Sequence, residues 1–297
     1  MAAFIMSGPL QAIGFALGFA LLAMFLPFLG LLSNAAIGLV TLRMGWRRGA
    51  MIALAVSVGL GVVALLVQGN VVGSLLSSLL QSMLIVALAI YLARTASWSK
   101  VLQVIFGLAA GLVVFFHLSV ADPVGFWKTA LKALVDFEQL QASLPDIKLD
   151  DLLNQVAKHM TGLFLASMGL AFTLSLMLAR HWQAALYNPG GFKEEMYGLR
   201  LNKLVALGVS AIIMLALVNR SAVLIDLLFV GLGLFLFQGI ALVHGVRAQL
   251  NAPRAWLLAL YIPLALLPVQ TGLLVAVFGM VDTFADFRTY LARRTKQ

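Results

Sequence analysis

A short run of serines with one glutamine is the first feature of the sequence that could bind a ligand. Ser74, Ser77, Ser78, Gln81 and Ser82 lie at spacings of three and four within an apolar segment, so on a helix they share one face. Hydroxyl and amide groups on one face suit a neutral polar ligand, but they also serve helix–helix packing in membranes. Both interpretations stay open, and we take Ser74, Ser78 and Gln81 as candidate ligand-binding residues.

A later apolar segment carries three more candidates, Asp226, Gln238 and His244. Ionisable residues inside apolar segments are costly and therefore point to function. Because 18 residues complete five helical turns, Asp226 and His244 lie on one face, which could line a polar cavity. Gln238 lies on a second face, rich in small residues, where it could hydrogen-bond to another helix. In the alternative, Asp226 pairs with Arg220, and His244 lies beside Arg247 near the membrane surface.

Known catalytic and metal-binding patterns do not occur in the chain. The motifs HExxH, GxSxG and GxxxxGK[ST] are absent. The four histidines, His117, His159, His181 and His244, lie far apart in sequence, at or near the ends of apolar segments, without metal-ligand spacing. The sequence has no cysteine, which rules out disulfides and thiol chemistry. We therefore expect no enzyme, no cofactor and no metal site.

The elements that position these residues are membrane spans. The chain is 62% hydrophobic and 10% charged, with a mean hydropathy of +1.03, far from the composition of soluble proteins. Its apolar runs approach the roughly 20 residues that a spanning helix needs, and they do not alternate as strands of a membrane barrel would. The net charge of +9 does not indicate nucleic-acid binding, because the Lys and Arg residues lie between the apolar runs. The sequence predicts an all-α polytopic transmembrane bundle, one domain over residues 1–297, in contact with the lipid bilayer.

Eight to ten membrane segments are predicted. The candidate segments are 8–25, 27–42, 48–67, 71–93, 101–120, 159–180, 201–219, 221–246, 254–268 and 270–286. The first has no basic region before it and exceeds signal-peptide length, so we expect a retained span. Segment 27–42 is short for a span, and Pro263 and Pro268 favour a break or hairpin within 254–286.

The distribution of basic residues orients the bundle. In the ten-segment version, both termini are cytoplasmic, and 15 of the 20 Lys and Arg residues fall on the cytoplasmic side. The five that remain outside are Lys128, Lys132, Lys148, Lys158 and Arg220. This orientation predicts a multi-pass membrane protein, and the family resemblance described below implies the bacterial inner membrane.

Two connections between segments have distinctive patterns. The extracytoplasmic connection, 121–158, predicts two amphipathic helices, one marked by Phe126, Trp127, Leu131, Leu134 and Val135, and one after Pro145 marked by Leu149, Leu152, Leu153 and Val156. They would lie on the outer membrane face or cap the bundle.

The cytoplasmic connection, 181–200, contains the turn signal Asn188-Pro189-Gly190-Gly191. Its aromatic and acidic residues favour either an interfacial hairpin or a docking loop for a cytoplasmic protein. For the second case the candidate contact residues are Asn188, Pro189, Gly190, Phe192 and Glu195.

Three sequence stretches resemble a known family. FQGIALVHGV (Phe237 to Val246) and FGMVDTFADFR (Phe278 to Arg288) resemble the YybS-like family of bacterial membrane proteins, and HWQAALYNPGGF (His181 to Phe192) is similar to a segment of its proteobacterial members. Residues that match these motifs are Gln238, Gly239, His244, Asp282, Asp286 and Arg288.

The resemblance implies a helical core like that of the substrate-binding S components of energy-coupling-factor transporters, to which the family is related together with MreD-like proteins. S components are thought to dock on their energising module through alanines four residues apart. Ala12, Ala16 and Ala20 have that spacing here and are candidate partner contacts.

Two hypotheses for function follow. In the first, the protein binds and moves a small solute or lipid-like molecule, and an ion gradient or a separate ATPase supplies the energy, since the chain has no nucleotide-binding motif. In the second, it is a non-catalytic scaffold in an envelope assembly, and the 181–200 loop and the basic tail from Arg288 to Gln297 contact protein partners.

Overall fold

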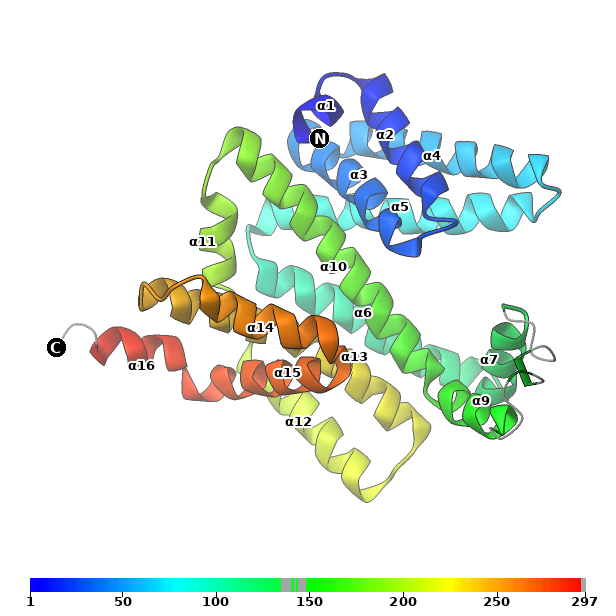
Figure 1. Cartoon of the computed structure of the whole chain (residues 1–297). Coiled ribbons are helices and arrows are strands. Elements are labelled where there is room, and N and C mark those ends of the chain that lie inside the picture. The colour runs from blue at the N-terminus through cyan, green and yellow to red at the C-terminus, as the bar shows by residue number, and fades with distance from the viewer. Residues whose placement is uncertain (135–139, 142, 144–147, 295–297) are drawn as a thin grey trace. The chain divides into compact units, whose positions relative to one another are not determined.

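A computed structural model describes residues 1–134, 140, 141, 143 and 148–294 of the chain (Figure 1). All regular secondary structure in these residues is helical, which confirms the all-α prediction. In this part of the chain, seven helices are long and apolar enough to cross a membrane: Pro27–Met44, Trp46–Leu66, Val71–Thr95, Trp98–Ser119, Met160–Tyr187, Ala222–Gln249 and Pro268–Ala285. Three shorter apolar helices cover the other predicted segments, Pro9–Leu22, Lys203–Val218 and Ala255–Leu266. The chain is therefore a polytopic helical membrane protein.

The described residues form two compact units. Unit 1 comprises residues 1–101 and 170–199, and unit 2 comprises 102–169 and 200–297. Two helices pass from one unit into the other, α6 (Trp98–Ser119) and α10 (Met160–Tyr187).

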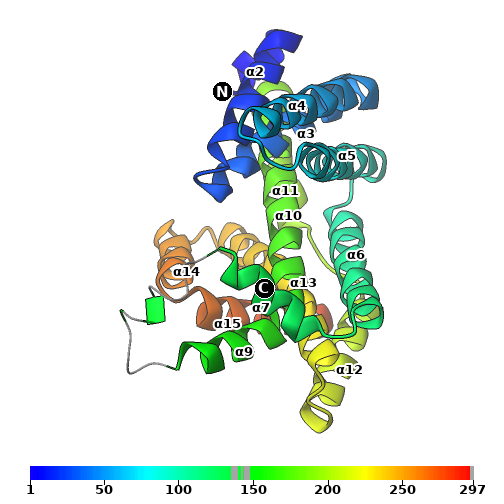
Figure 2. The ribbon, with the colours of Figure 1, turned by 90° about the vertical axis from the view of Figure 1, so that its right-hand side faces the viewer.

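Unit 1 is built around three consecutive apolar helices. Besides parts of α6 and α10 it contains α1 (Ala2–Met6), α2 (Pro9–Leu22), η1 (Pro27–Leu29), α3 (Gly30–Met44), α4 (Trp46–Leu66), α5 (Val71–Thr95) and α11 (Gly191–Tyr197). The hairpin partners α4 and α5 pack along much of their length, as Figures 1 and 2 show. Small residues set the spacing: a Cβ atom on Gly49 of α4 would lie 1.9 Å from Thr41 Oγ1 of α3.

Unit 2 is organised by its longest helix, α13 (Ala222–Gln249). Its other elements are α7 (Pro123–Lys132), α9 (Leu149–Lys158), α12 (Lys203–Val218), α14 (Ala255–Leu266), α15 (Pro268–Ala285) and α16 (Phe287–Arg294). The helix α13 packs most extensively against α15. A Cβ atom on Gly279 of α15 would lie 2.4 Å from the carbonyl oxygen of Phe235 and 2.6 Å from the nitrogen of Gly239, so the two backbones touch.

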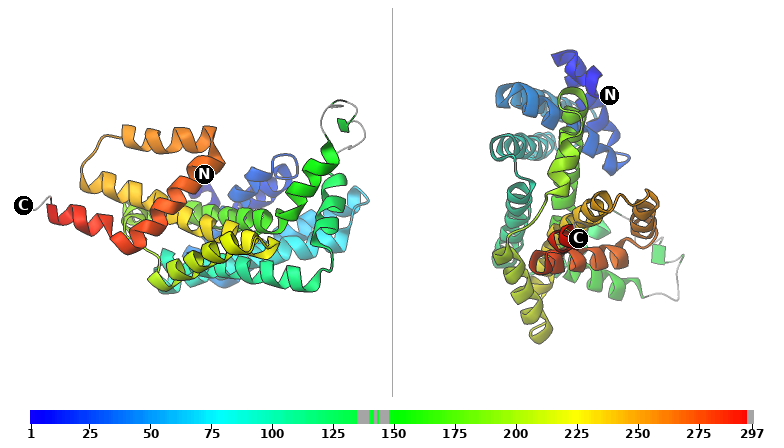
Figure 3. Two further views of the ribbon diagram at one scale, coloured as in Figure 1. Left: turned by 90° about the horizontal axis from the view of Figure 1, so that it is seen from below. Right: turned by 90° about the vertical axis from the view of Figure 1, so that its left-hand side faces the viewer.

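The predicted break between the last two apolar segments is present. Helix α14 ends at Leu266 and α15 begins at Pro268, joined at a sharp bend that Figure 3 shows. Leu267 at the bend has φ −132° and ψ 65°. Pro268 explains the bend, because the residue before a proline is driven out of the helical region. Pro263 lies inside α14 without ending it.

Both predicted amphipathic helices of the 121–158 connection are present, as α7 and α9, and they pack on each other. The α9 side chains that face inward are Leu149 and Leu153, whereas Leu152 and Val156 are exposed. Asp150 accepts hydrogen bonds from Lys128 (3.1 Å) and Lys132 (3.3 Å) of α7, which lower the pKa of its carboxyl group. The predicted marker residues Val135 and Pro145 lie outside the described residues.

Candidate functional sites

A polar pocket opens among α2, α3, α4 and α5 of unit 1. Its volume is about 400 Å³, within the range of small-molecule sites, roughly 300–1,000 Å³. Seven of its lining residues are polar and uncharged: Ser33, Asn34, Ser74, Ser77, Ser78, Gln81 and Ser82. Apolar side chains such as Met24, Val56, Leu60 and Val67 complete the wall.

The predicted face of α5 supplies most of these polar groups. Asn70 caps the helix by accepting a 2.8 Å hydrogen bond from the Gly73 nitrogen, and from there the spacing of three and four turns the serines to one side. The structure therefore brings Ser74, Ser78 and Gln81 to the wall of one pocket. That they bind a ligand there stays a prediction.

The polar groups of the pocket differ in whether they make hydrogen bonds within the protein. Ser78 donates a 3.0 Å hydrogen bond to the buried hydroxyl oxygen of Ser57 on α4, which ties the two helices together. The side-chain amides of Asn34 and Gln81, in contrast, have no hydrogen-bond partner among the described residues. Each amide offers two donors and one acceptor oxygen. These groups are available to a polar molecule in the pocket.

The sequence predicts that three alanines along α2 contact a partner, but two of them are buried within unit 1. Ala12 and Ala16 are 2% and 0% exposed within unit 1, so they pack α2 on its own unit and are not presented to a partner. Ala20 is half-buried and lines the polar pocket. Small residues permit close helix packing whether the neighbouring helix belongs to the same chain or to another, so the spacing alone could not distinguish the two cases.

A second polar site surrounds Asp226 in unit 2. The carboxylate is fully buried, its Oδ2 lies 2.8 Å from His117 Nε2 of α6, and its Oδ1 lies 3.6 Å from His159 Nδ1 at the start of α10. Gly162 of α10 makes this approach possible, because a Cβ atom there would lie 2.4 Å from the Asp226 Cα atom. Arg220, the partner weighed from the sequence, is exposed, and histidines fill that role instead.

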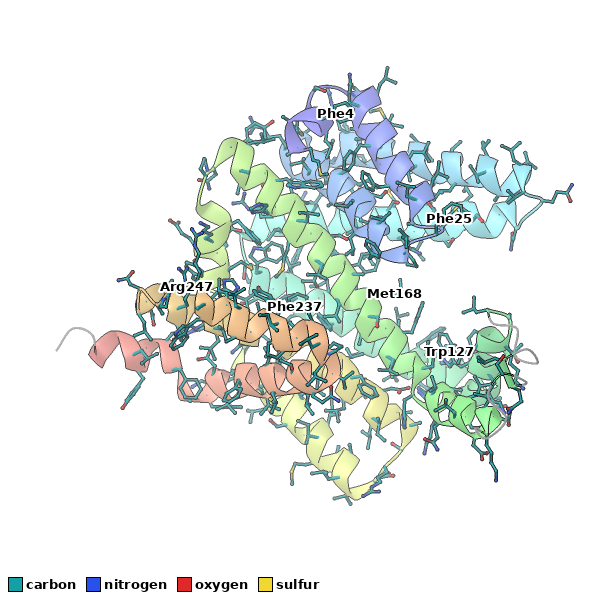
Figure 4. All side chains as sticks on the ribbon, viewed as in Figure 1. Phe4, Phe25, Trp127, Met168, Phe237 and Arg247 are labelled. Carbon is teal, nitrogen blue, oxygen red and sulfur yellow. The ribbon has the colours of Figure 1, made fainter. Side chains whose placement is uncertain are left out.

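An aromatic group lies beside this site. Trp127 of α7, labelled in Figure 4, donates a 2.8 Å hydrogen bond to the buried Thr161 hydroxyl oxygen. Its ring packs in a tilted arrangement against Phe116 and Phe164, at centroid distances of 6.0 and 5.4 Å. The amphipathic helix α7 is thus anchored next to His117 and the start of α10.

The sequence did not reveal that His117 and His159 would meet at Asp226. These two histidines lie far apart along the chain but face the same carboxylate in the fold. The topology held a usable signal, because the predicted orientation puts residues 117, 159 and 226 at the outer ends of their segments. The expectation of no metal site stays a prediction: in the described parts of the chain, no group of three or more His, Asp or Glu side chains could hold a metal ion.

Gln238 lies at the contact between α13 and α15. It is fully buried, and its oxygen accepts a 2.9 Å hydrogen bond from the Leu201 nitrogen. Its amide nitrogen donates to the Gly279 carbonyl oxygen at 2.7 Å and to the Thr283 hydroxyl oxygen at 2.9 Å. This geometry is the helix–helix hydrogen bonding that the sequence allowed. It occupies the atoms that a ligand would need.

His244 is distant from Asp226 despite sharing its helix face. Eighteen residues of helix separate them by about 27 Å. The ring nitrogen Nε2 of His244 lies 2.8 Å from the Tyr261 hydroxyl of α14. The two residues therefore belong to different sites.

The 181–200 connection is a turn and a short helix. Helix α10 continues to Tyr187, Asn188, Pro189 and Gly190 are exposed, and Gly190 has φ +95°, a conformation that favours glycine. This places three of the predicted contact residues on an accessible turn.

The other two predicted contact residues of this connection are engaged inside unit 1. Glu195 accepts hydrogen bonds from the Arg180 guanidinium (3.1 and 3.2 Å from Nε) and from the Trp98 indole (3.0 Å). Phe192 packs edge-on against Trp98 and His181. These contacts hold α11 against α6 and α10, as an interfacial hairpin requires.

Fold and sites together define the class: a multi-pass α-helical membrane protein with a polar pocket in one unit and a buried carboxylate–histidine group in the other. No protein-family model, curated protein or solved structure matches the chain.

Proposed function

We propose that this protein binds a small polar solute, or the polar part of a lipid-like molecule, in the unit 1 pocket and moves it across the bacterial inner membrane. The observation that carries the proposal is the pair of side-chain amides, Asn34 and Gln81, without partners on the wall of a pocket of about 400 Å³. Asn34 is half-buried and Gln81 is exposed, so both amides can reach a molecule in the pocket. Each hydrogen bond that a bound solute makes to them contributes roughly 0.5–1.5 kcal/mol.

The lining of the pocket favours an uncharged ligand. It includes no Asp, Glu, Lys, Arg or His among the described residues, so a charged solute would find no counter-charge. Hydroxyl and amide groups on α3 and α5 suit a ligand with several hydroxyl, carbonyl or amide groups. The apolar side chains opposite them suit a ligand that also has an apolar part.

The resemblance to YybS-like proteins supports the same proposal. The matching stretches place Gln238, Asp282 and Arg288 together in unit 2, where Arg288 donates a 2.8 Å hydrogen bond to Asp282. We propose that the chain is a member of this family, with an S-component-like core. The energy for transport would come from an ion gradient or a partner ATPase.

Native mass spectrometry tests the proposed ligand. We expect protein purified in a mild detergent to carry a reproducible small molecule or lipid, because the pocket is polar and its amides lack partners. Gln81→Leu and Asn34→Leu should each weaken binding by roughly two- to tenfold, since each lost hydrogen bond to the ligand contributes roughly 0.5–1.5 kcal/mol.

Gln270→Leu is the matched control for this measurement. Gln270 is an exposed glutamine on α15 and does not line the pocket, so its replacement should leave the bound mass unchanged. A protein that is empty but copurifies with a stoichiometric protein partner would contradict the proposal and favour a scaffold.

Single-cysteine labelling tests the proposed orientation. Because the natural chain has no cysteine, one introduced thiol reports one position. We expect a membrane-impermeant maleimide to label Asp151→Cys in intact spheroplasts and Asn188→Cys only after the membrane is opened, since both positions are exposed and lie on opposite sides in the proposed topology. Labelling of both variants in intact spheroplasts would overturn that topology.

A further inference from the structure

We propose that His117, Asp226 and His159 form a single proton-binding site in unit 2. Three separate elements supply the groups: the end of α6, the start of α13 and the junction of α9 with α10. The inference uses unit 2 alone, so it stands whether or not the unit 1 pocket binds a solute.

One of the two carboxylate oxygens of Asp226 is buried without a hydrogen-bond partner among the described residues. Its Oδ2 is engaged by His117 at 2.8 Å, but its Oδ1 is buried and has no hydrogen-bond partner within the described residues. The atom that faces it, His159 Nδ1, is also buried and also without a partner there. Two facing polar atoms left unsatisfied are unusual, because buried carboxylate oxygens nearly always accept a hydrogen bond.

Asp226 Oδ1 and His159 Nδ1 lie just beyond hydrogen-bond distance of each other. At 3.6 Å they are too far apart for a hydrogen bond, which needs about 2.7–3.2 Å. A movement of less than about 1 Å would close the gap. A proton on His159 supplies the reason to close it, because the imidazolium N–H would donate to the carboxylate in a charge-assisted hydrogen bond.

The two histidines are partly exposed to water, whereas the carboxylate of Asp226 is not. The Asp226 side chain is 0% exposed, whereas the side chains of His117 and His159 are 10% and 23% exposed. The rings therefore connect the buried carboxylate to the surface near α7 and α9. Histidine suits this role, because its ordinary proton exchange falls between pH 5 and 8 and each ring nitrogen can hold or release a proton. Asp, Glu and His groups in membrane spans serve as proton relays.

Other charged groups around the site are engaged elsewhere. Lys128 and Lys132 of α7 pair with Asp150 of α9, and Asp122 caps α7 by accepting from the Gly125 nitrogen. Lys158, at the end of α9, is exposed. The groups that act on Asp226 are His117, His159 and the backbone of Gly162. The proton content of the site is thus set by one carboxylate and the two imidazoles that face it.

Histidine-selective NMR tests the proposal with the proton itself as the probe. The chain has four histidines, so protein labelled with ¹³C at histidine Cε1 gives four signals, assigned with His117→Gln and His159→Gln. We expect the His117 and His159 signals to shift together as the pH is varied between 4.5 and 9. In Asp226→Asn the response of both signals should differ from wild type, because both rings lose the carboxylate that they face.

His181 and His244 are the internal controls. Neither contacts Asp226, so their curves should be unchanged in Asp226→Asn, and unchanged signals also show that the variant is folded. If that variant does not fold, His159→Gln replaces it, and the His117 curve should then differ from wild type. Wild-type rings at 117 and 159 that do not titrate would overturn the proposal, as would curves that superimpose in wild type and variants.

Discussion

Replacing Gly279 with alanine is expected to force α13 and α15 apart and to destabilise unit 2 by about 3 kcal/mol or more. The new Cβ would lie 2.4 Å from the Phe235 carbonyl oxygen, 2.6 Å from the Gly239 nitrogen and 3.0 Å from the Gly239 Cα atom. All three are backbone atoms, so no side chain can rotate away and the helices themselves must move. The separation would also stretch the 2.7 Å hydrogen bond from Gln238 to the Gly279 carbonyl oxygen.

The midpoint of thermal unfolding in detergent measures this effect. Size-exclusion chromatography of heated samples gives the fraction that remains folded at each temperature. Gly107→Ala is the matched control, because a Cβ at that helical glycine of α6 meets nothing within 4 Å. Its midpoint should stay the same or rise slightly, since alanine favours the helix by up to about 1 kcal/mol. Equal midpoints for Gly279→Ala and Gly107→Ala would show that the two backbones are not in contact.

Removing the buried carboxylate of Asp282 is expected to cost about 3–5 kcal/mol. Arg288 donates a 2.8 Å hydrogen bond to it, and the side chains of Arg288 and Asp282 are 5% and 0% exposed. Asp282 also accepts from the Phe287 nitrogen at 3.1 Å, which fixes the start of α16. Asp282→Ala would remove the carboxylate that balances the charge of a buried guanidinium, and the loss of this ion pair dominates the destabilisation.

The double variant Asp282→Leu/Arg288→Leu tests whether the destabilisation comes from the buried charge or from the change in side-chain shape. It removes both charges, so the unfolding midpoint should recover much of the way toward wild type. A double variant as unstable as Asp282→Ala would mean that charge burial is not the cause.

The exposed pair Arg200–Asp286 is the second control for this experiment. The hydrogen bond from Arg200 lowers the pKa of Asp286 from 3.8 to about 2. Because the folded-state pKa is depressed, the pair stabilises the fold fully above pH about 4 and loses this effect as pH falls toward 2. Both side chains are about 40% exposed, so solvent screening limits the loss in Asp286→Asn to about 1 kcal/mol or less.

Features that depend on neighbours along the chain could be predicted from the sequence. Within the described residues, hydropathy located the seven long apolar helices and the three shorter ones, because a span needs a long apolar run whatever it packs against. Pro268 marked the bend before α15 for a local steric reason. The face formed by Ser74, Ser78 and Gln81 followed from helix geometry alone, and it lines the unit 1 pocket.

Contacts between helices that are far apart in the sequence could not be predicted in the same way. His117, His159 and Asp226 meet because α10 approaches α13 at Gly162, and no spacing in the sequence encodes which helices touch. The partners of Gln238 include backbone atoms of Leu201 and Gly279, which leave no mark in a pattern of side chains. Ala12 and Ala16 could have faced a partner or the interior, since a small side chain fits both.

The position of Asp226 along the chain has a consequence for biosynthesis. A carboxylate in an apolar segment hinders its entry into the bilayer, by about 2.5–3.5 kcal/mol at the helix centre and less toward the ends. His117 and His159 both precede Asp226 in the sequence, so the ribosome releases them first. The segments that carry them can already be in the membrane when α13 emerges, and its charged residue then enters next to the groups that neutralise it.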